Sequence, residues 1–207
     1  MSTGYKQARE NMNNTSNVTN THNGHEFVDL GLPSGTLWAT CNVGATSPEQ
    51  TGLYFAWGET TGYTAEQIKK KERVFDKVSY KARGIFKKLT LEQDAAHVNL
   101  GGNWRMPTKD EFRELIENCD ASWTDDYNGT GVKGRIFTSK VNGNSVFFPA
   151  VGGCFDSSVY CVGSYGYYWS ASWYSSSDAW RLGFYSGGQH LNNFYRCNGR
   201  TVRGVCK

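Results

Sequence analysis

The stretch that most constrains the fold of this chain lies near its C-terminus, over residues 167–203. Its middle reads AWRLGFY, residues 179–185, in which apolar residues alternate with polar or small ones. The apolar set is Trp180, Leu182 and Phe184, and the alternating set is Arg181, Gly183 and Tyr185. A period of two predicts a β-strand whose first set is buried and whose second set faces solvent. Trp169 and Val202 complete the predicted buried frame of this region.

The residues between these apolar positions have the composition of a binding surface. Tyrosine supplies rigid contact area, and serine, glycine and asparagine supply adaptable hydrogen bonds. The candidate ligand-binding residues are Tyr174, Ser175, Ser176, Ser177, Asp178, Arg181, Gly183, Tyr185, His190, Asn192, Phe194, Tyr195, Cys197 and Asn198. We expect them to form one contiguous patch, with Phe194 or Tyr195 in solvent as an anchor for a partner. An ordinary solvated strand face followed by a polar loop has a similar composition and is the alternative.

Lysine and glutamate are missing from the same part of the chain. All glutamates and all lysines but one lie within residues 1–140, and the remaining lysine is Lys207. Residues 141–206 also lack methionine. Strands disfavour Lys and Glu only mildly, and exposed strands and edges normally use Lys. A codon ending in a pyrimidine encodes none of these three residues, so randomised Asn codons would leave this gap.

Length and composition predict one domain preceded by an arm. The chain has 207 residues, of which 38% are hydrophobic and 14% aromatic. We place a C-terminal domain at residues 25–207, with a variable region at about 167–200. Residues 1–24 are rich in Asn and Thr and poor in large apolar groups, which predicts disorder. The alternative for this arm is an ordered attachment to a larger structure.

Charge and hydropathy exclude two classes of partner. A net charge of +3 is too weak to indicate a nucleic-acid-binding protein. No apolar run approaches the roughly 18 residues of a membrane span, and no apolar segment of a secretory signal begins the chain.

Local patterns predict several elements. Thr108 and Glu111 form a capping box before an apolar stripe, which predicts a helix over residues 108–119. Asn142-Gly143 is typical of a β-hairpin turn. The predicted strands are residues 26–30, 36–43, 135–140, 145–148 and 201–206, with a short strand or anchor at 53–57.

A basic segment, residues 69–88, interrupts this pattern. Nine lysines and arginines stand there against Glu72 and Asp76. The segment is either an anion-binding patch or a solvated insertion, and we favour the insertion because no platform for base stacking accompanies it.

The six cysteines do not define a disulfide pattern, because six cysteines allow 15 pairings. Cys154 and Cys161 are close in sequence and form a plausible pair. Cys41 and Cys206 would meet if the terminal strands pair. All six would stay reduced in a protein assembled inside a cell, and Cys197 falls within the candidate variable set.

Several longer phrases resemble a known family. In order they are HEFVDLGLPSGTLWATCNVGA, GLYFAWGET, DAAHVNLGGNWRMPTKDEFREL, GNSVFFPAVG, GSYGYYWSAS and NGRTVRGVC. From residue 25 to the C-terminus they resemble the major paralogous domain of gut bacterial surface proteins. That group is related to the formylglycine-generating-enzyme branch of the C-type lectin fold, and WRMPTKDEFREL resembles a helix start of that branch. Variable proteins of diversity-generating retroelements share this fold and carry randomised residues in their C-terminal strands and loops.

The chemistry of related proteins is not expected here. The Glu-Pro-Asn, Gln-Pro-Asp and Trp-Asn-Asp triplets of calcium lectins are absent, and a calcium site needs several carboxylates. The cysteine spacings do not match the closely spaced pair of formylglycine-generating enzymes. The four histidines show no metal spacing. We therefore expect no catalytic residues, no metal and no cofactor.

The resemblance and the patterns together predict an α+β protein of C-type lectin fold, with small mixed or antiparallel sheets, about two helices and long loops. Its expected function is binding of a protein or glycan receptor through a diversified surface, on a phage virion or a bacterial cell. The arm would attach it to a larger phage or envelope structure. The alternative is a non-variable adhesin or structural module of the same fold.

Overall fold

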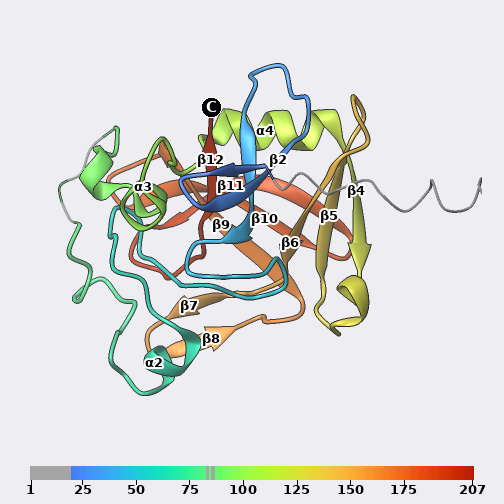
Figure 1. Ribbon diagram of the computed structural model, residues 1–207. Helices are drawn as coiled ribbons and strands as arrows, with labels where there is room; N and C mark the ends of the chain where they lie inside the picture. The colour runs from blue at the N-terminus through green and yellow to red at the C-terminus, as the bar shows by residue number, and fades with distance from the viewer. Residues whose placement is uncertain (1–19, 83, 85–86) are drawn as a thin grey trace, which may run out of the picture.

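The computed structural model describes residues 20–82, 84 and 87–207. Among these residues the strands form four small sheets, in which every pair of adjacent strands runs antiparallel, and there are three short α-helices (Figure 1). The predicted α+β class is confirmed, with one helix more than the two expected. Of the predicted arm, residues 1–19 lie outside the described residues.

A four-stranded sheet joins the two ends of the domain. Its order is β1-β2-β3-β12. The strands are β1 (Thr21–His22), β2 (His25–Asp29), β3 (Leu37–Asn42) and β12 (Arg203–Cys206). The predicted strands at residues 26–30, 36–43 and 201–206 are therefore confirmed. Because β1 pairs with β2, the described fold begins before residue 25, where the sequence had placed the domain boundary.

Fully buried Arg203 connects this sheet to the next one. Its Nε donates to Oδ1 of Asn42 at 3.0 Å, and its Nη1 donates to the carbonyl of Ala39 at 2.9 Å. Its Nη2 reaches the carbonyl of Phe147, in β6, at 3.0 Å. Charged donors bonded to several acceptors satisfy a guanidinium that burial would otherwise destabilise.

A second sheet, β4-β5-β6, contains the predicted hairpin. Its strands are β4 (Cys119–Thr124), β5 (Gly134–Ser139) and β6 (Ser145–Pro149). The turn between β5 and β6 contains Asn142-Gly143, and Gly143 has a φ of +76°, which glycine adopts at no steric cost. The hairpin and its turn are thus confirmed.

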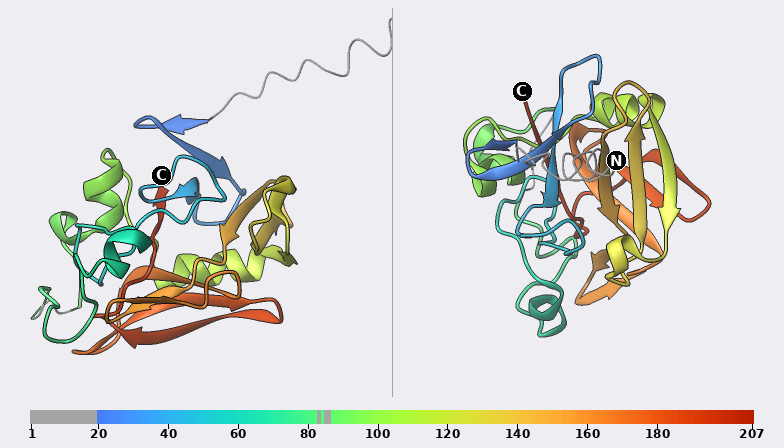
Figure 2. Two further views of the ribbon diagram at one scale, coloured as in Figure 1. Left: turned by 90° about the horizontal axis from the view of Figure 1, so that it is seen from below. Right: turned by 45° about the vertical axis from the view of Figure 1, so that its right-hand side comes forward.

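The third sheet, β11-β10-β9, packs one face against the longest helix. It contains β9 (Tyr165–Trp173), β10 (Asp178–Tyr185) and β11 (Gly188–Tyr195), and the helix is α4 (Lys109–Asn118). Tyr168, Leu182 and Phe184 share a core cluster with Phe112 and Leu115 of α4. Figure 2, left, shows α4 on one side of these strands, while their other side forms one side of the molecule.

The alternation predicted for residues 179–185 gives the correct side of β10 for each side chain, but it does not give the correct solvent exposure for each side. Leu182 and Phe184 are buried on the α4 side, as expected. Trp180 is only half-buried, because the register against β9 shifts between Ala179 and Arg181 and the fully buried residue there is Ala179. Arg181, predicted to face solvent, is only 5% exposed.

The remaining elements are short. They are α2 (Ala65–Lys69), η1 (Leu91–Gln93), α3 (Ala95–Leu100), η2 (Tyr127–Gly129), β7 (Gly153–Phe155) and β8 (Ser158–Tyr160). In the chain, α2 and η1 flank the basic segment. The described lysines of residues 69–88 are exposed, as a solvated insertion predicts. Arg73 is buried instead and pairs with Glu59, and Phe75 bridges to Asp156 of the β7–β8 turn. Arg83 lies outside the described residues.

All six cysteines are free, so neither proposed pairing is present. Cys154 is buried in the core between Tyr54 and Phe75, whereas Cys161 is exposed beyond the end of β8. Strands β3 and β12 do pair, but Cys206 lies opposite Leu37 and not opposite Cys41.

The capping box of α4 is present as predicted. Thr108 Oγ1 accepts a hydrogen bond from the Glu111 backbone N–H at 3.1 Å, and Glu111 Oε2 accepts one from the Thr108 N–H at 2.8 Å. We expect Thr108→Ala to lower the free energy of unfolding by about 1 kcal/mol through loss of the N-cap, without affecting ligand binding. Urea denaturation measures the change, and Thr108→Ser, which keeps the hydroxyl, is the control. Equal stability of the Ala and Ser variants would show that the cap contributes nothing.

Candidate functional site

The face of β9–β10–β11 directed away from α4, which we call the outer face, carries six of the fourteen predicted binding residues: Arg181, Gly183, Tyr185, His190, Asn192 and Phe194. Antiparallel pairing sets Gly183 opposite His190 and Arg181 opposite Asn192. Residues paired in this way point to the same side of a sheet. The outer face therefore combines side chains from all three strands, and they come from residues 165–194.

Aromatic rings cover much of the outer face. Tyr165 stacks on Tyr185 with ring centroids 5.6 Å apart, and on Tyr167 at 5.7 Å. The guanidinium carbon of Arg181 lies 4.2 Å from the centroid of the Tyr167 ring and 5.1 Å from that of Phe194. Contacts of this length are cation–π interactions. The outer face is thus a packed layer of aromatic rings and guanidinium groups.

The loop of residues 174–177, between β9 and β10, is held by its own side chains. Ser175 Oγ accepts hydrogen bonds from the backbone N–H groups of Ser177 at 3.2 Å and Asp178 at 3.0 Å. The Asp178 carboxylate accepts from the hydroxyls of both serines. A loop that is ordered before binding loses less conformational entropy when a ligand binds. Tyr174, which is 47% exposed, projects from this loop.

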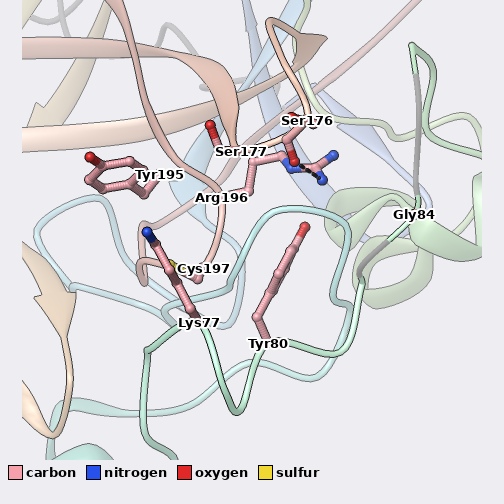
Figure 3. Close-up of a pocket in the computed structure, with 8 residues that line it drawn as sticks. All are labelled: Lys77, Tyr80, Gly84, Ser176, Ser177, Tyr195, Arg196 and Cys197. Atoms are coloured by element: carbon pink, nitrogen blue, oxygen red, sulfur yellow. Dashed lines mark hydrogen bonds between the residues drawn. The ribbon is translucent and has the colours of Figure 1, made fainter.

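A pocket of about 480 Å³ lies where this loop meets the basic segment (Figure 3). It is lined by Lys77, Tyr80, Gly84, Ser176, Ser177, Tyr195, Arg196 and Cys197. Arg196 Nη2 donates to the Ser176 carbonyl at 2.5 Å, and Lys77 Nζ lies 5.2 Å from the centroid of the Tyr195 ring. None of the described lining residues is acidic. The pocket therefore offers aromatic walls and positive charge.

The Tyr80 ring is a fixed wall of this pocket. Its hydroxyl donates to the Trp57 carbonyl at 2.6 Å, and burial raises the pKa of Tyr80 well above its usual range. A tyrosine held in this way is a hydrogen-bond donor and an apolar surface, and not a base. Its place in the pocket had no local signal in the sequence, because the segment that carries it meets the hairpin only in the tertiary structure.

The fourteen predicted binding residues fall into three groups. The exposed residues are Tyr174, Ser176, Ser177, Tyr185 and Tyr195. The half-buried residues are Ser175, Asp178, His190, Asn192 and Phe194. The buried residues are Arg181, Gly183, Cys197 and Asn198. The expectation that Phe194 or Tyr195 stands in solvent is confirmed by Tyr195, which is 47% exposed.

The four buried residues correct the prediction of a fully exposed patch. Arg181 lies beneath aromatic rings, and Gly183 lies beneath Arg181 and His190. Cys197 and Asn198 follow β11, where residues 196–200 leave the sheet and run between two other segments. Cys154 N–H donates to the Gly199 carbonyl on one side, and Phe55 N–H donates to the Arg200 carbonyl on the other, both at 2.8 Å. Covered on two sides, this segment has little contact with solvent.

Comparisons of this chain with protein-family models, with curated proteins and with solved structures found no match. The function of the surface is therefore inferred from its own geometry. Among the described residues, no group of three or more His, Cys, Asp or Glu side chains is placed to hold a metal ion. No helix in the described part of the chain is long and apolar enough to cross a membrane.

The buried thiols of this region are protonated at neutral pH. Burial raises the pKa of Cys154 to about 12 and also raises the pKa of Cys197. Because the thiolate is the reactive form of cysteine, neither group is suited to nucleophilic chemistry.

Tyr160, Tyr165 and Tyr167 belong to the outer face or its border but were not among the predicted binding residues. The phrase YGYYW, residues 165–169, did contain a signal, since Tyr165 and Tyr167 are two positions apart. Of this phrase, only Trp169, which is fully buried, was predicted for the buried frame, and none of its tyrosines was predicted as a binding residue.

Proposed function

We propose that this chain is a ligand-binding protein that displays a diversified surface on a C-type lectin-fold scaffold, as a variable protein of a diversity-generating retroelement. The observation that carries this proposal is that the stretch without Lys, Glu or Met, residues 141–206, supplies the outer face and the loop of residues 174–177. It also supplies five of the eight residues lining the pocket. A compositional gap and a continuous surface thus fall on the same part of the molecule.

The physical basis for diversification is the separation of exposed side chains from a buried frame. Substitutions at exposed sites usually change stability by about 0.5 kcal/mol or less. Trp169, Leu182, Phe184 and Val202 are fully buried and hold the backbone in place. The exposed tyrosines and serines can therefore change without altering the sheet beneath them.

Variation is more restricted at the buried positions of the predicted set. A Cβ on Gly183 would lie 2.6 Å from His190 Nε2 and 2.7 Å from Arg181 Nη1, so any side chain there must displace both. We therefore assign diversification to the exposed and half-buried residues. The expected partner is a protein or glycan receptor, and the protein acts by binding and not by catalysis.

The alternative function is a non-variable adhesin of the same fold. The close packing of Arg181 against Tyr167 and Phe194 favours it, because a layer of interlocked side chains tolerates fewer substitutions than an open strand face. The genomic sequence separates the two functions. A diversified protein requires a nearby template repeat that differs from the gene only at adenines, together with a reverse transcriptase gene, and an adhesin requires neither.

We expect simultaneous replacement of Tyr174, Ser176, Ser177 and Tyr195 by Ala to abolish receptor binding while leaving the melting temperature almost unchanged. These residues are exposed and lie at one end of the β10–β11 hairpin, so they contribute contact area and little core packing. A binding assay on cells that the parent protein recognises and a thermal melt are made on the same variant.

Val98→Ala with Val141→Ala is the matched control, because both valines are exposed and lie outside residues 165–198. Loss of folding in the fourfold variant would show that the surface is structural. Retained binding would show that the receptor binds elsewhere.

A further inference from the structure

Three arginines show how guanidinium groups that are buried or half-buried in this chain can be bonded to acceptors. Arg73 donates two hydrogen bonds from Nη2 to the Glu59 carboxylate, at 2.9 and 2.7 Å. Arg105 binds both carboxylate oxygens of Glu111. Arg203 is bonded to an amide and to three backbone carbonyls. Each of these guanidinium groups donates to at least two acceptor atoms, which replace water lost on folding, although Nε of Arg73 has no partner within the described residues.

Arg181 does not follow this pattern. It is 5% exposed, yet its Nε and Nη1 have no hydrogen-bond partner among the described residues, and no ion pair joins it to a described carboxylate. Its contacts are the rings of Tyr167 and Phe194. Cation–π contacts offset only part of the cost of removing a guanidinium from water.

Arg200 places a second positive charge beneath the same rings. It is 1% exposed, and its guanidinium carbon lies 4.8 Å from the Tyr167 ring and 4.9 Å from the Phe194 ring. It donates to the Gly199 carbonyl and the Tyr160 hydroxyl, both neutral, while its Nε has no partner in the described structure. Two like charges thus share one aromatic cover, and no described carboxylate forms an ion pair with either of them.

The neighbouring groups do not neutralise this pair. Burial and the charge of Arg200 lower the pKa of Arg181 to about 10, so it remains protonated at neutral pH. Burial and the charge of Arg181 lower the pKa of His190, which lies beside it. Asn192 lies opposite Arg181 on β11, and its Oδ1 has no partner in the part of the chain that the structure describes, but an amide carries no charge. Buried polar groups left unpaired in this way call for a partner.

A hollow of about 440 Å³ lies beside Tyr160 and Phe194, two of the rings that contact the arginines. It is lined by Phe155, Asp156, Ser158, Tyr160, Phe194, Tyr195 and Asn198. Tyr160 and Phe194 also form part of the cover of Arg200, and both are only half-buried. A change of rotamer at these two rings would open a path from the hollow to the guanidinium groups. Asp156, at its rim, forms no ion pair with either arginine within the described residues.

We propose that Arg181 and Arg200 form an anion-binding site, which holds one carboxylate, sulfate or phosphate group of a ligand that enters beside Tyr160 and Phe194. The planar donor fork of arginine matches the oxygen atoms of these groups. The inference rests on the proposed function, since it assigns a chemical class to the ligand of the same surface. The anion supplies the missing acceptors and the countercharge, and the aromatic rings supply contact area around it.

The test is a titration of the full-length protein with sodium acetate, sodium sulfate and sodium phosphate, each against sodium chloride at equal ionic strength. Calorimetry measures affinity, and NMR follows the Nε–Hε signals of the two arginines. We expect saturable binding of at least one anion, and Arg181→Met should weaken it about tenfold or more. Acetate binding would indicate a carboxylate ligand, whereas preference for sulfate or phosphate would indicate a tetrahedral anion.

The control is Lys109→Met, which removes one positive charge from the opposite side of the same sheet, where Lys109 Nζ lies 4.8 Å from the Trp180 ring. Affinity should be unchanged in this variant. Equal anion affinity in Arg181→Met and the parent protein would overturn the proposal. If Arg181→Met does not fold, the NMR titration of the parent protein tests the proposal by itself. The proposal would be overturned if none of the three anions shifted the arginine Nε–Hε signals.

The anion site and the proposed function can fail separately, because the fourfold variant at Tyr174, Ser176, Ser177 and Tyr195 keeps both arginines. Anion binding by that variant together with loss of receptor binding supports both proposals. If the variant loses receptor binding and the parent protein binds no anion, the proposed function stands and only the anion site is overturned.

Discussion

Replacing Trp169 by Ala is expected to lower the free energy of unfolding by about 3–5 kcal/mol, the usual range for a large aromatic residue in a core. The Trp169 side chain is fully buried, and its Nε1 donates to the Phe55 carbonyl at 3.0 Å. Its backbone N–H donates to the Thr201 carbonyl, also at 3.0 Å. The substitution would leave a cavity between β9, the segment around Phe55 and the C-terminal chain, and would remove one of the two hydrogen bonds that the Phe55 carbonyl accepts.

Chemical denaturation measures this effect, and Trp180→Ala is the matched control. Trp180 lies in the same sheet but is half-buried, with Tyr174 and Lys109 against its ring. Since less of its surface is removed from water, we expect it to cost less than half as much as Trp169. Equal costs for the two tryptophans would mean that the frame does not depend on Trp169.

The second large effect is expected in acid. Burial raises the pKa of Glu111, but hydrogen bonds from Arg105, Thr108 and Thr36 outweigh it and hold the pKa at about 2. A carboxyl group with a depressed pKa in the folded state stabilises the protein above the pKa of the unfolded state. This contribution is lost as the pH falls from about 4.5 towards 2. The Arg105 side chain is 32% exposed, so solvent screens its interaction with Glu111. We therefore expect the loss of stability in acid to be about 2 kcal/mol.

Urea denaturation at pH 7, 5, 4 and 3 tests this expectation in the parent protein and in Glu111→Gln. The parent should lose stability more steeply than the variant below pH 4.5, because the side-chain amide that replaces the carboxyl group does not titrate. Asp94 acts in the opposite direction, since burial raises its pKa, and it is common to both proteins. Parallel pH profiles would show that the Glu111–Arg105 pair contributes no pH-dependent stability.

Local sequence patterns predicted the elements whose cause is local. The capping box at Thr108 and Glu111 specified the start of α4, and Asn142-Gly143 specified the turn of the β5–β6 hairpin. The alternation in β10 assigned Leu182 and Phe184 to the side that packs on α4. These features depend on residues within a few positions of one another, so the sequence alone contains enough information to place them.

The candidate site was predicted only in part. Exposed residues at the ends of the hairpin, such as Tyr174, Tyr185 and Tyr195, follow from composition and position. The contribution of Lys77 and Tyr80 to the pocket does not, because nearly 100 residues separate them from the loop of residues 174–177 that they meet. Contacts between such distant segments leave no periodic signal in either segment.

The sequence by itself determined which side of β10 each residue occupies, because side-chain direction in a strand alternates with every residue. Only the tertiary structure decided which of these residues meet solvent. Arg181 points away from α4, as the alternation requires, but rings from β9 and β11 cover it. The chain after β11 brings Arg200 beneath the same rings. Burial depends on what packs over a face, and that is set by contacts between strands and loops far apart in the chain.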